Sequence, residues 1–445
     1  MNSKSRRLLL MLLVAGATSS CMFKDLRHQQ QQLDGMCLIS GTVAAEAPAR
    51  VPRVVVLLGN VNGSWQVKDR FITEGDGRWL MVAQPGSYTI AAFEDPSRDS
   101  VYQPGEPALK GSHAVNCAGG ARLEDLNLKI TADNSTLPHG IDITHSRDSI
   151  TAVGTITTLQ DSRFADENVK AGIWTPYDFL VKTGAGVYFL EPYDPAKTPV
   201  LFVHGMGGSP RDFRSVIEKL DTKAFQPWVY YYPSGAGLHR LAEHLDETMS
   251  NIELKYSVPS FVVVAHSMGG LVAREFLLMR QGRRASAKVL SFVTVSTPWA
   301  GHNGARIGLT LAPTPVPSWI DMAPASDYLS SLFSGGRTGH RSLDVPYYLL
   351  FSYKKSAGSF GESNDGVVSV ASELRAEAQQ EAAGMYGFND SHEEILDDPA
   401  AARLIFKLVQ QHTELKEVET ITHAVIAPGE MPQFDLPDLA TWDGG

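Results

Sequence analysis

The sequence predicts an α/β fold with a mostly parallel sheet and helices on both faces, preceded by a small all-β sandwich module. Two observations indicate the sheet. Apolar runs alternate with amphipathic, helix-like stretches from about 186 to 295, and one run, 262–265, stops abruptly at a serine before a helical pattern. A third observation indicates the module, since only short apolar runs separated by Gly, Pro and Asp occur between 35 and 130.

The chain of 445 residues is too long for one domain, so we expect several units. In chain order these are a signal peptide (1–20), a polar, glutamine-rich tether (21–34), the β-sandwich module (35–130), a linker (131–172), the α/β domain (173–415) with an insert at 301–345, and a C-terminal tail (416–445). The tail lacks periodicity and carries prolines and acidic residues, so we expect it to be extended or partly ordered.

The first twenty residues have the pattern of an export signal. Three basic residues precede an apolar run at 8–17, which is too short to cross a membrane as a helix. Small residues then lead to Cys21, a pattern that resembles a bacterial lipobox, although Thr18 stands where leucine is more usual. The resemblance implies a lipid anchor on Cys21. Because no aspartate follows directly, it further implies an outer-membrane lipoprotein that faces the periplasm or the exterior. The alternative is ordinary secretion after cleavage nearby.

The cysteines and the net charge indicate a disulfide and argue against one class of partner. With Cys21 taken by a lipid, Cys37 and Cys117 remain as an even pair in an oxidising compartment, so we expect a disulfide between them. The net charge of −10 and the lack of a basic cluster argue against nucleic acid as a partner.

The expected elements follow from the apolar pattern. In the module we expect strands at 37–43, 54–58, 79–82 and 87–93, and the segment Pro85–Tyr88 resembles the carboxypeptidase-regulatory or transthyretin-like modules. In the α/β domain we expect strands at 186–190, 199–203, 227–232, 261–265, 289–295 and 347–351, and helices at 210–220, 238–255, 268–281 and 398–411.

Ser267 stands where the apolar run 262–265 meets a helical pattern, which is typical of a nucleophile elbow. Such a turn exposes the serine hydroxyl above a helix N-terminus and brings backbone against backbone. Small residues are therefore needed two positions away on either side, and Ala265 and Gly269 supply them. The alternative is a serine that only caps a buried helix.

A glycine-rich loop after an earlier strand, 204–210, provides the second part of the site. Acyl transfer requires two N–H donors aimed at the oxyanion, and in this architecture one comes from the residue after the serine, Met268. Met206 is the candidate for the other donor, because the glycines around it let the backbone approach a substrate. The alternative is a structural or phosphate-binding turn, but the Lys and Ser/Thr of a Walker loop are absent.

The remaining members of a triad should follow in the order acid, then histidine. Of the late histidines, His412 and His423 have the pattern of solvated surface, whereas His392 precedes the terminal helix, where a triad histidine belongs. For the acid we choose Asp365, at an Asp-Gly turn after the strand 347–351; the alternatives are a bare turn aspartate there, or Asp321 or Glu362 as the acid.

With these residues identified, the chain from about 174 to 412 resembles the α/β-hydrolases, and within them the bacterial lipases. The matching segments are 204–206, 265–269, 296–298, 364–368 and 391–392, and 319–326 is similar to inositol-deacylase and lecithin-acyltransferase relatives. The resemblance implies the α/β-hydrolase fold and acyl chemistry without specifying one substrate. Family lipases often bind calcium through an aspartate after the triad histidine. Glu393 and Glu394 stand there instead, so no metal is carried over.

These residue types predict one mechanism. Ser267 attacks an ester carbonyl, His392 takes its proton, and Asp365 orients the imidazole, so no metal or organic cofactor is needed. The apolar insert at 301–345 is suited to covering an acyl chain, or it simply packs on the core. We therefore expect an exported, lipid-anchored esterase or lipase that acts on small-molecule or lipid esters. Acyl transfer with the same triad, amide or peptide cleavage, and a non-catalytic surface-binding role are the alternatives.

Overall fold

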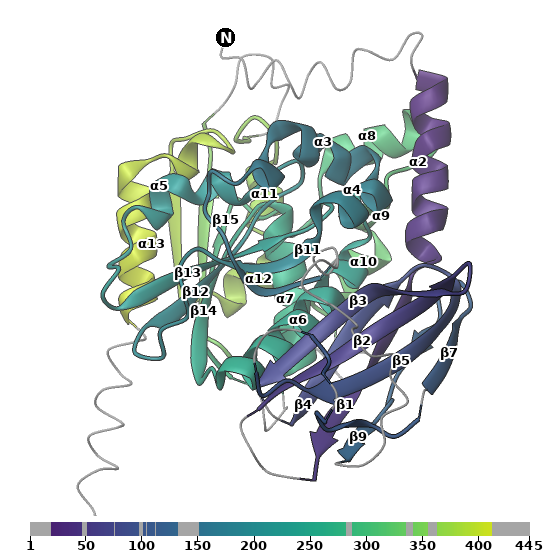
Figure 1. Ribbon diagram of the computed structural model, residues 1–445. Coiled ribbons are helices and arrows are strands. Elements are labelled where there is room, and N and C mark those ends of the chain that lie inside the picture. The colour runs from purple at the N-terminus through teal and green to yellow at the C-terminus, as the bar shows by residue number, and fades with distance from the viewer. Residues whose placement is uncertain are drawn as a thin grey trace, which may run out of the picture.

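A computed structural model of the chain describes residues 19–46, 51–131 with gaps at 75, 98–100, 104 and 112, 151–281, 287–334, 341–354 and 363–411. The expected signal peptide up to residue 18 and the C-terminal tail lie outside the described residues. Figure 1 shows the two folded units, a β-rich module and a larger α/β domain, with helix α2 beside them.

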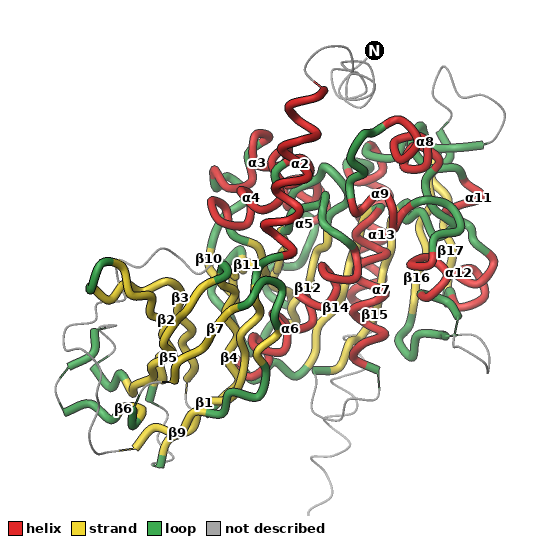
Figure 2. The backbone as a smooth tube through the Cα atoms, turned by 90° about the vertical axis from the view of Figure 1, so that its right-hand side faces the viewer, coloured by secondary structure: helices red, strands yellow, loops and turns green. Residues whose placement is uncertain are grey.

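The expected tether is helical. Helix α2 (Ser19–Asp34) packs against α4 (Pro176–Thr183), and Figure 2 shows it running alongside the α/β domain. Leu26 is fully buried, and the side chain of Gln29 accepts a hydrogen bond from the N–H of Asp178 at 2.9 Å. The glutamine-rich composition indicated a tether, and these contacts dock that segment onto the α/β domain.

The N-terminal module is β-rich, as expected. Its strands are β1 (Cys37–Ala45), β2 (Pro52–Val61), β3 (Ser64–Glu74), β4 (Gly77–Ala83), β5 (Gly86–Glu94), β6 (Ala108–Leu109), β7 (His113–Cys117), β8 (Arg122–Leu123) and β9 (Leu128–Thr131). The described strands form one continuous nine-stranded sheet in the order β3-β2-β5-β6-β9-β1-β4, with β7 beside β5 and β8 beside β1. Buried side chains from β1, β2, β4, β5 and β9 share one hydrophobic core.

The core of the module explains why buried and more exposed residues alternate along its strands. In β1 the burial pattern alternates along the strand, and Cys37, Ile39 and Val43 are fully buried. Trp79 of β4 lies in the same core. Cys37 and Cys117 form a disulfide with a Cα–Cα distance of 5.8 Å, which ties the first strand to β7.

The α/β domain is built on an eight-stranded sheet in the order β10-β11-β13-β12-β14-β15-β16-β17. Its strands are β10 (Thr151–Ile156), β11 (Ala185–Phe189), β12 (Thr198–Val203), β13 (Phe225–Tyr231), β14 (Ser260–His266), β15 (Lys288–Val295), β16 (Tyr347–Ser352) and β17 (Gly384–Phe388). All neighbours are parallel except β11 and β13. The expected linker 131–172 is therefore wrong at its end, because β10 already belongs to this sheet.

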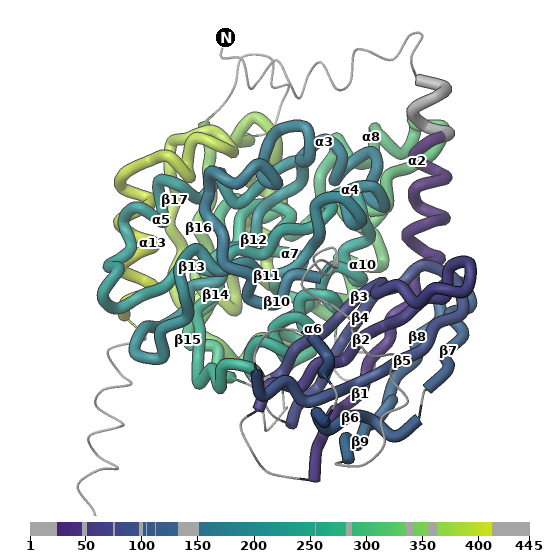
Figure 3. Tube along the Cα trace, viewed as in Figure 1, coloured from purple at the N-terminus to yellow at the C-terminus, as the bar shows by residue number. Residues whose placement is uncertain are grey.

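Helices cover both faces of the sheet, as expected. One face packs against α6 (Leu238–Tyr256) and α7 (Met268–Arg280), and the other against α5 (Arg214–Ile217) and α13 (Pro399–Gln411). Figure 3 shows α5 and α13 side by side although nearly two hundred residues separate them in sequence. The expected helix 210–220 is shorter, a 3-10 turn (Pro210–Phe213) followed by α5.

The remaining helices surround the ends of the strands. They are the 3-10 turns at Ser162–Phe164 and Glu394–Leu396, and α3 (Asp166–Trp174), α8 (Asn303–Leu311), α9 (Pro317–Met322), α10 (Asp327–Ser331), α11 (Val370–Glu373) and α12 (Ala376–Glu381). Helices α8 to α10 form the expected insert. None of the helices in the described ranges combines the length and the apolar character that crossing a membrane requires.

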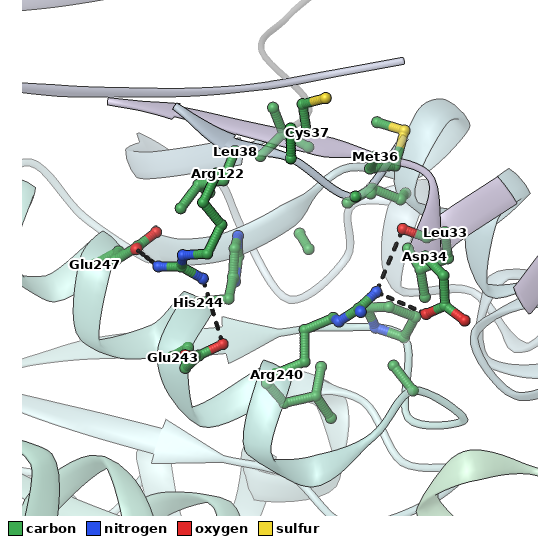
Figure 4. A pocket seen from close by; sticks show the side chains of 18 residues that line it. Leu33, Asp34, Met36, Cys37, Leu38, Arg122, Arg240, Glu243, His244 and Glu247 are labelled. Atoms are coloured by element: carbon green, nitrogen blue, oxygen red, sulfur yellow. Dashed lines mark hydrogen bonds and ion pairs between the residues drawn. The ribbon is translucent and has the colours of Figure 1, made fainter. Parts of the chain in front are cut away.

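The β-rich module contacts the α/β domain along α6. Arg122 lies 3.0 Å from Glu247 and 3.5 Å from Glu243, and Arg240 lies 2.9 Å from Asp34. A cavity of about 320 Å³ lies at this boundary, and Figure 4 shows the two arginines pointing toward their carboxylates at its wall. Because these ions are paired and partly exposed, we assign the Arg122 pairs a role in docking the module and the Arg240–Asp34 pair a role in docking the end of α2, worth about 0–1 kcal/mol per pair.

Candidate active site

Ser267 occupies a sharp turn between β14 and α7. Its φ of 53° and ψ of −129° are unusual for a residue with a side chain. The turn is held by the N–H of Ser267, which donates to the carbonyl of Val295 at 2.8 Å. Such backbone strain costs about 1–3 kcal/mol and persists where the surrounding structure enforces it. The residue is only partly buried.

The turn requires small residues around the serine. A Cβ on Gly269 would lie 2.3 Å from the carbonyl oxygen of Val203, and a Cβ on Gly270 would lie 2.0 Å from Oγ1 of Thr297. Ala265 is fully buried in β14. The expected need for a small residue at 269 therefore has a direct steric basis, and the same need extends to 270.

The structure brings Ser267, His392 and Asp365 together. Nε2 of His392 lies 2.8 Å from Oγ of Ser267, and its Nδ1 lies 2.5 Å from Oδ2 of Asp365. The backbone N–H of His392 also donates to the carbonyl of Asp365 at 3.0 Å. The imidazole thus stands between the hydroxyl and the carboxylate, with one ring nitrogen toward each.

Four donors surround the carboxylate of Asp365, which is completely buried. Oδ1 accepts from the N–H groups of Val367 (2.9 Å) and Val368 (2.7 Å), and Oδ2 accepts from Oγ of Ser352 (2.9 Å) as well as from His392. Burial alone would raise the pKa of Asp365, but His392 and the hydrogen bonds outweigh it and lower the pKa to about 2. The acid is therefore ionised at neutral pH.

Two further histidines position the site. Nε2 of His266 lies 2.9 Å from the carbonyl oxygen of His392, and burial together with His392 lowers the pKa of His266 to about 3. Nε2 of His302 lies 2.9 Å from the carbonyl oxygen of Val367, in the turn that carries Asp365. Each neutral ring can donate its Nε2–H to a carbonyl. Neither histidine is recognisable from the sequence as part of the site, although His266 directly precedes the serine.

The glycine-rich loop lies directly against the serine. A Cβ on Gly205 would lie 2.8 Å from Cβ of Ser267. The loop is fixed by the N–H of Gly207, which donates to Oγ of Ser234 at 3.1 Å, and by a capping box between Ser209 and Asp212.

The two expected oxyanion donors lie at this junction, and neither is used internally. Met268 is the first residue of α7, so its N–H has no partner within the helix, and Met206 belongs to the loop that contacts the serine. Within the ranges that the structure describes, no acceptor is found for either N–H.

The position of the site in the sheet follows from topology. The chain passes from β12 to β13 on one side and later to β14 on the other, so the strand order reverses at β12. The loop of Met206 follows β12, and Ser267 follows β14. Ligands of open α/β sheets bind beyond the carboxyl ends of strands at such a switch point.

The alternative site residues lie elsewhere. Asp321 accepts a hydrogen bond from the N–H of Leu238 at 2.7 Å and thereby caps α6. Glu362, His412 and His423 lie outside the described residues.

Two groups stand out among the apolar side chains of the insert. Five are at most 4% exposed and pack on the core: Val316, Met322, Leu329, Leu332 and Phe333. Three others on α8 and α9 are open to solvent, Ile307 at 50%, Leu311 at 72% and Ile320 at 48%. The insert is thus part of the core and also presents apolar surface.

Part of the chain is similar to known proteins. Residues 198–336 match the family described as "alpha/beta hydrolase fold". A Bacillus licheniformis lipase in its mature form is 17% identical with a TM-score of 0.40, over 50% of this chain and 97% of the lipase. Aspergillus fumigatus lipase B is 16% identical with a TM-score of 0.39, over 63% of this chain and 64% of that protein.

A phospholipase of Legionella pneumophila is 17% identical with a TM-score of 0.32, over 40% of this chain and 46% of the phospholipase. The chain has no match among curated proteins. The family match, the strand order and the strand–serine–helix turn together show that the larger unit of this chain has the α/β-hydrolase fold.

Proposed function

We propose that the chain is a serine hydrolase that cleaves carboxylic esters, and that lipid or acyl esters are its substrates. The observation that carries the proposal is the hydrogen-bonded chain from Ser267 through His392 to Asp365 at a strained strand-to-helix turn. A serine that merely caps a helix has no need of a histidine at 2.8 Å with a buried carboxylate behind it.

The geometry suits an acyl-enzyme mechanism. Oγ of Ser267 attacks the ester carbonyl carbon while Nε2 of His392 accepts the hydroxyl proton. The N–H groups of Met206 and Met268 stabilise the oxyanion, and the leaving alcohol departs with the proton from His392. Water then attacks the acyl-enzyme, gives a proton to His392, and releases the carboxylic acid as Oγ regains its proton. Asp365 stays ionised throughout and stabilises the imidazolium.

The substrate class rests on the insert. Ile307, Leu311 and Ile320 present apolar surface on α8 and α9. Single exposed apolar residues are common, but three on neighbouring short helices favour contact with an acyl chain.

The experiment is hydrolysis of p-nitrophenyl esters from C2 to C16 by the full-length chain in mild detergent, with Ser267→Ala measured beside it. We expect Ser267→Ala to lower kcat/KM by roughly 10⁴-fold or more. Equal rates for the two proteins would refute the mechanism. A short-chain optimum that still depends on Ser267 would keep the mechanism and remove the lipid substrate. Formation of a new ester from an added alcohol would identify an acyltransferase.

We also propose that Cys21 carries a lipid that anchors the chain in the bacterial outer membrane. The support is the basic and apolar pattern before Cys21, which lies near the start of α2. Metabolic labelling with a radioactive fatty acid should mark the wild-type chain and leave Cys21→Ser unlabelled. Label retained in Cys21→Ser would contradict the anchor.

A further inference from the structure

A second acid lies buried behind the triad. Glu373 is the last residue of α11 and is 1% exposed. Its Oε2 accepts a hydrogen bond from the backbone N–H of Ser352 at 3.1 Å, and the hydroxyl of Ser352 donates to Asp365 at 2.9 Å. The two carboxyl groups thus share one serine, and their side chains lie within hydrogen-bonding reach of each other.

Ionising Asp365 and Glu373 at the same time would carry a high free-energy cost in this arrangement. As a carboxylate, Glu373 would leave Oε1 buried without a hydrogen-bond partner, facing a second negative charge. Asp365 has four donors, including His392, whereas Glu373 has one backbone donor and Ser296 nearby. Where two carboxyls interact in this way, the poorly solvated one keeps the proton.

The electrostatics agree with the geometry. Burial and the charge of Asp365 raise the pKa of Glu373 to about 10, while the pKa of Asp365 is lowered to about 2. The other titratable groups that act on the pair are His392, His266 and His302. Burial lowers the pKa of both His266 and His302, so neither adds a positive charge that could balance a second carboxylate.

We propose that Glu373 is a positioning residue that stays protonated and donates its O–H to Asp365, so that the triad acid is held from behind. The proposal rests on the proposed function, because it acts through Asp365 on His392. A donated hydrogen bond keeps the carboxylate of Asp365 aimed at the imidazole, and a neutral Glu373 avoids overstabilising the imidazolium. Glu373 itself touches no reacting atom.

The first test is the pH profile of kcat/KM. In Glu373→Gln the amide N–H₂ replaces the O–H donor, so we expect activity within about threefold of wild type and an unmoved acid limb. In Glu373→Met the side chain has similar length but no donor. Asp365 then stabilises the imidazolium more strongly, and we expect about tenfold lower kcat and an acid limb at higher pH. If Glu373 is ionised in the wild type, Glu373→Gln removes a negative charge and its acid limb moves to lower pH, which overturns the proposal.

The second test needs no activity, since it compares the unfolding equilibrium of wild type and Glu373→Gln in urea from pH 5 to pH 9. In the unfolded chain Glu373 loses its proton above its ordinary pKa, whereas in the folded chain it keeps the proton up to about pH 10. The folded state therefore binds more protons in this window, and wild-type stability should fall with rising pH relative to the Gln variant. We expect a change of about tenfold per pH unit in the ratio of the two unfolding constants.

The exposed residue Glu218 provides the matched control, because Glu218→Gln makes the same chemical change at the surface. We expect its stability difference from wild type to stay flat between pH 5 and pH 9. A flat difference for Glu373→Gln as well would overturn the proposal. If wild type shows no Ser267-dependent hydrolysis, the proposed function fails, and the urea comparison alone still decides whether Glu373 is protonated.

Discussion

Replacing Asp365 by asparagine exchanges one carboxylate oxygen for an N–H₂ group, and the structure determines which one. Oδ1 faces two donors, the N–H groups of Val367 and Val368 at 2.9 and 2.7 Å. An amide nitrogen there would place donor against donor, so the amide oxygen takes this side. The N–H₂ then takes the place of Oδ2, which lies 2.5 Å from Nδ1 of His392.

The substitution changes the tautomer of His392. Facing an N–H₂ group, Nδ1 must act as an acceptor, and the ring proton moves to Nε2. Nε2 then donates to Ser267 and can no longer take its proton. For the wrong tautomer in a serine triad the loss in kcat is roughly 10⁴-fold, which corresponds to about 5 kcal/mol of transition-state stabilisation.

The assay is kcat for a p-nitrophenyl ester at pH 8, together with a thermal melt followed by circular dichroism to show that the variant folds. Asp321→Asn makes the same exchange at the carboxylate that caps α6, and it should retain wild-type kcat. An Asp365→Asn variant that is folded and retains more than a tenth of the wild-type kcat would refute the reasoning.

Three further results are expected. Cys37→Ala with Cys117→Ala should lower the free energy of unfolding in urea by about 4–5 kcal/mol, since the bridge spans 80 residues, and a loss below 1 kcal/mol would contradict this. Arg274→Met should lower the free energy of unfolding by about 3–5 kcal/mol, because the buried carboxylate of Glu381, which lies 2.7 Å from the guanidinium, loses its positive partner. Adding Glu381→Gln should recover part of this loss in the same assay. Gly205→Ala should lower kcat/KM about 100-fold, because the added Cβ would clash with Ser267 and displace the nucleophile. An unchanged kcat/KM would show that the loop moves to accommodate the methyl group.

The sheet of the α/β domain could be predicted because its signals are local. The buried strand β14 is a continuous apolar run, and every residue of it is buried. The elbow could be predicted for the same reason, since an apolar run that meets a serine and then a helical pattern is a local signal, although the steric demand on Gly269 comes from Val203 and His204, far away along the chain. The continuous sheet of the β-rich module could not, because strand pairing depends on partners far along the chain.

Two boundaries show where local patterns mislead. Strand β10 is short, and among the described strands it lies at the edge of the sheet beside β11, so its place in the domain depends on pairing that a local pattern does not reveal. Helix α2 is polar along most of its length, and its order comes from docking against α4 rather than from an apolar stripe.

By itself, the sequence determined the fold class of the larger domain and the residue types of its site, because apolar periodicity and turn chemistry act between near neighbours. Only the tertiary structure decided which acid and which histidine meet the serine, since His392 lies 125 residues from Ser267 along the chain and 27 from Asp365. It alone revealed Glu373, because a single glutamate shows no sign in sequence of whether it faces water or a second buried carboxylate. Burial is a property of the packed chain, and burial governs the charge of that group.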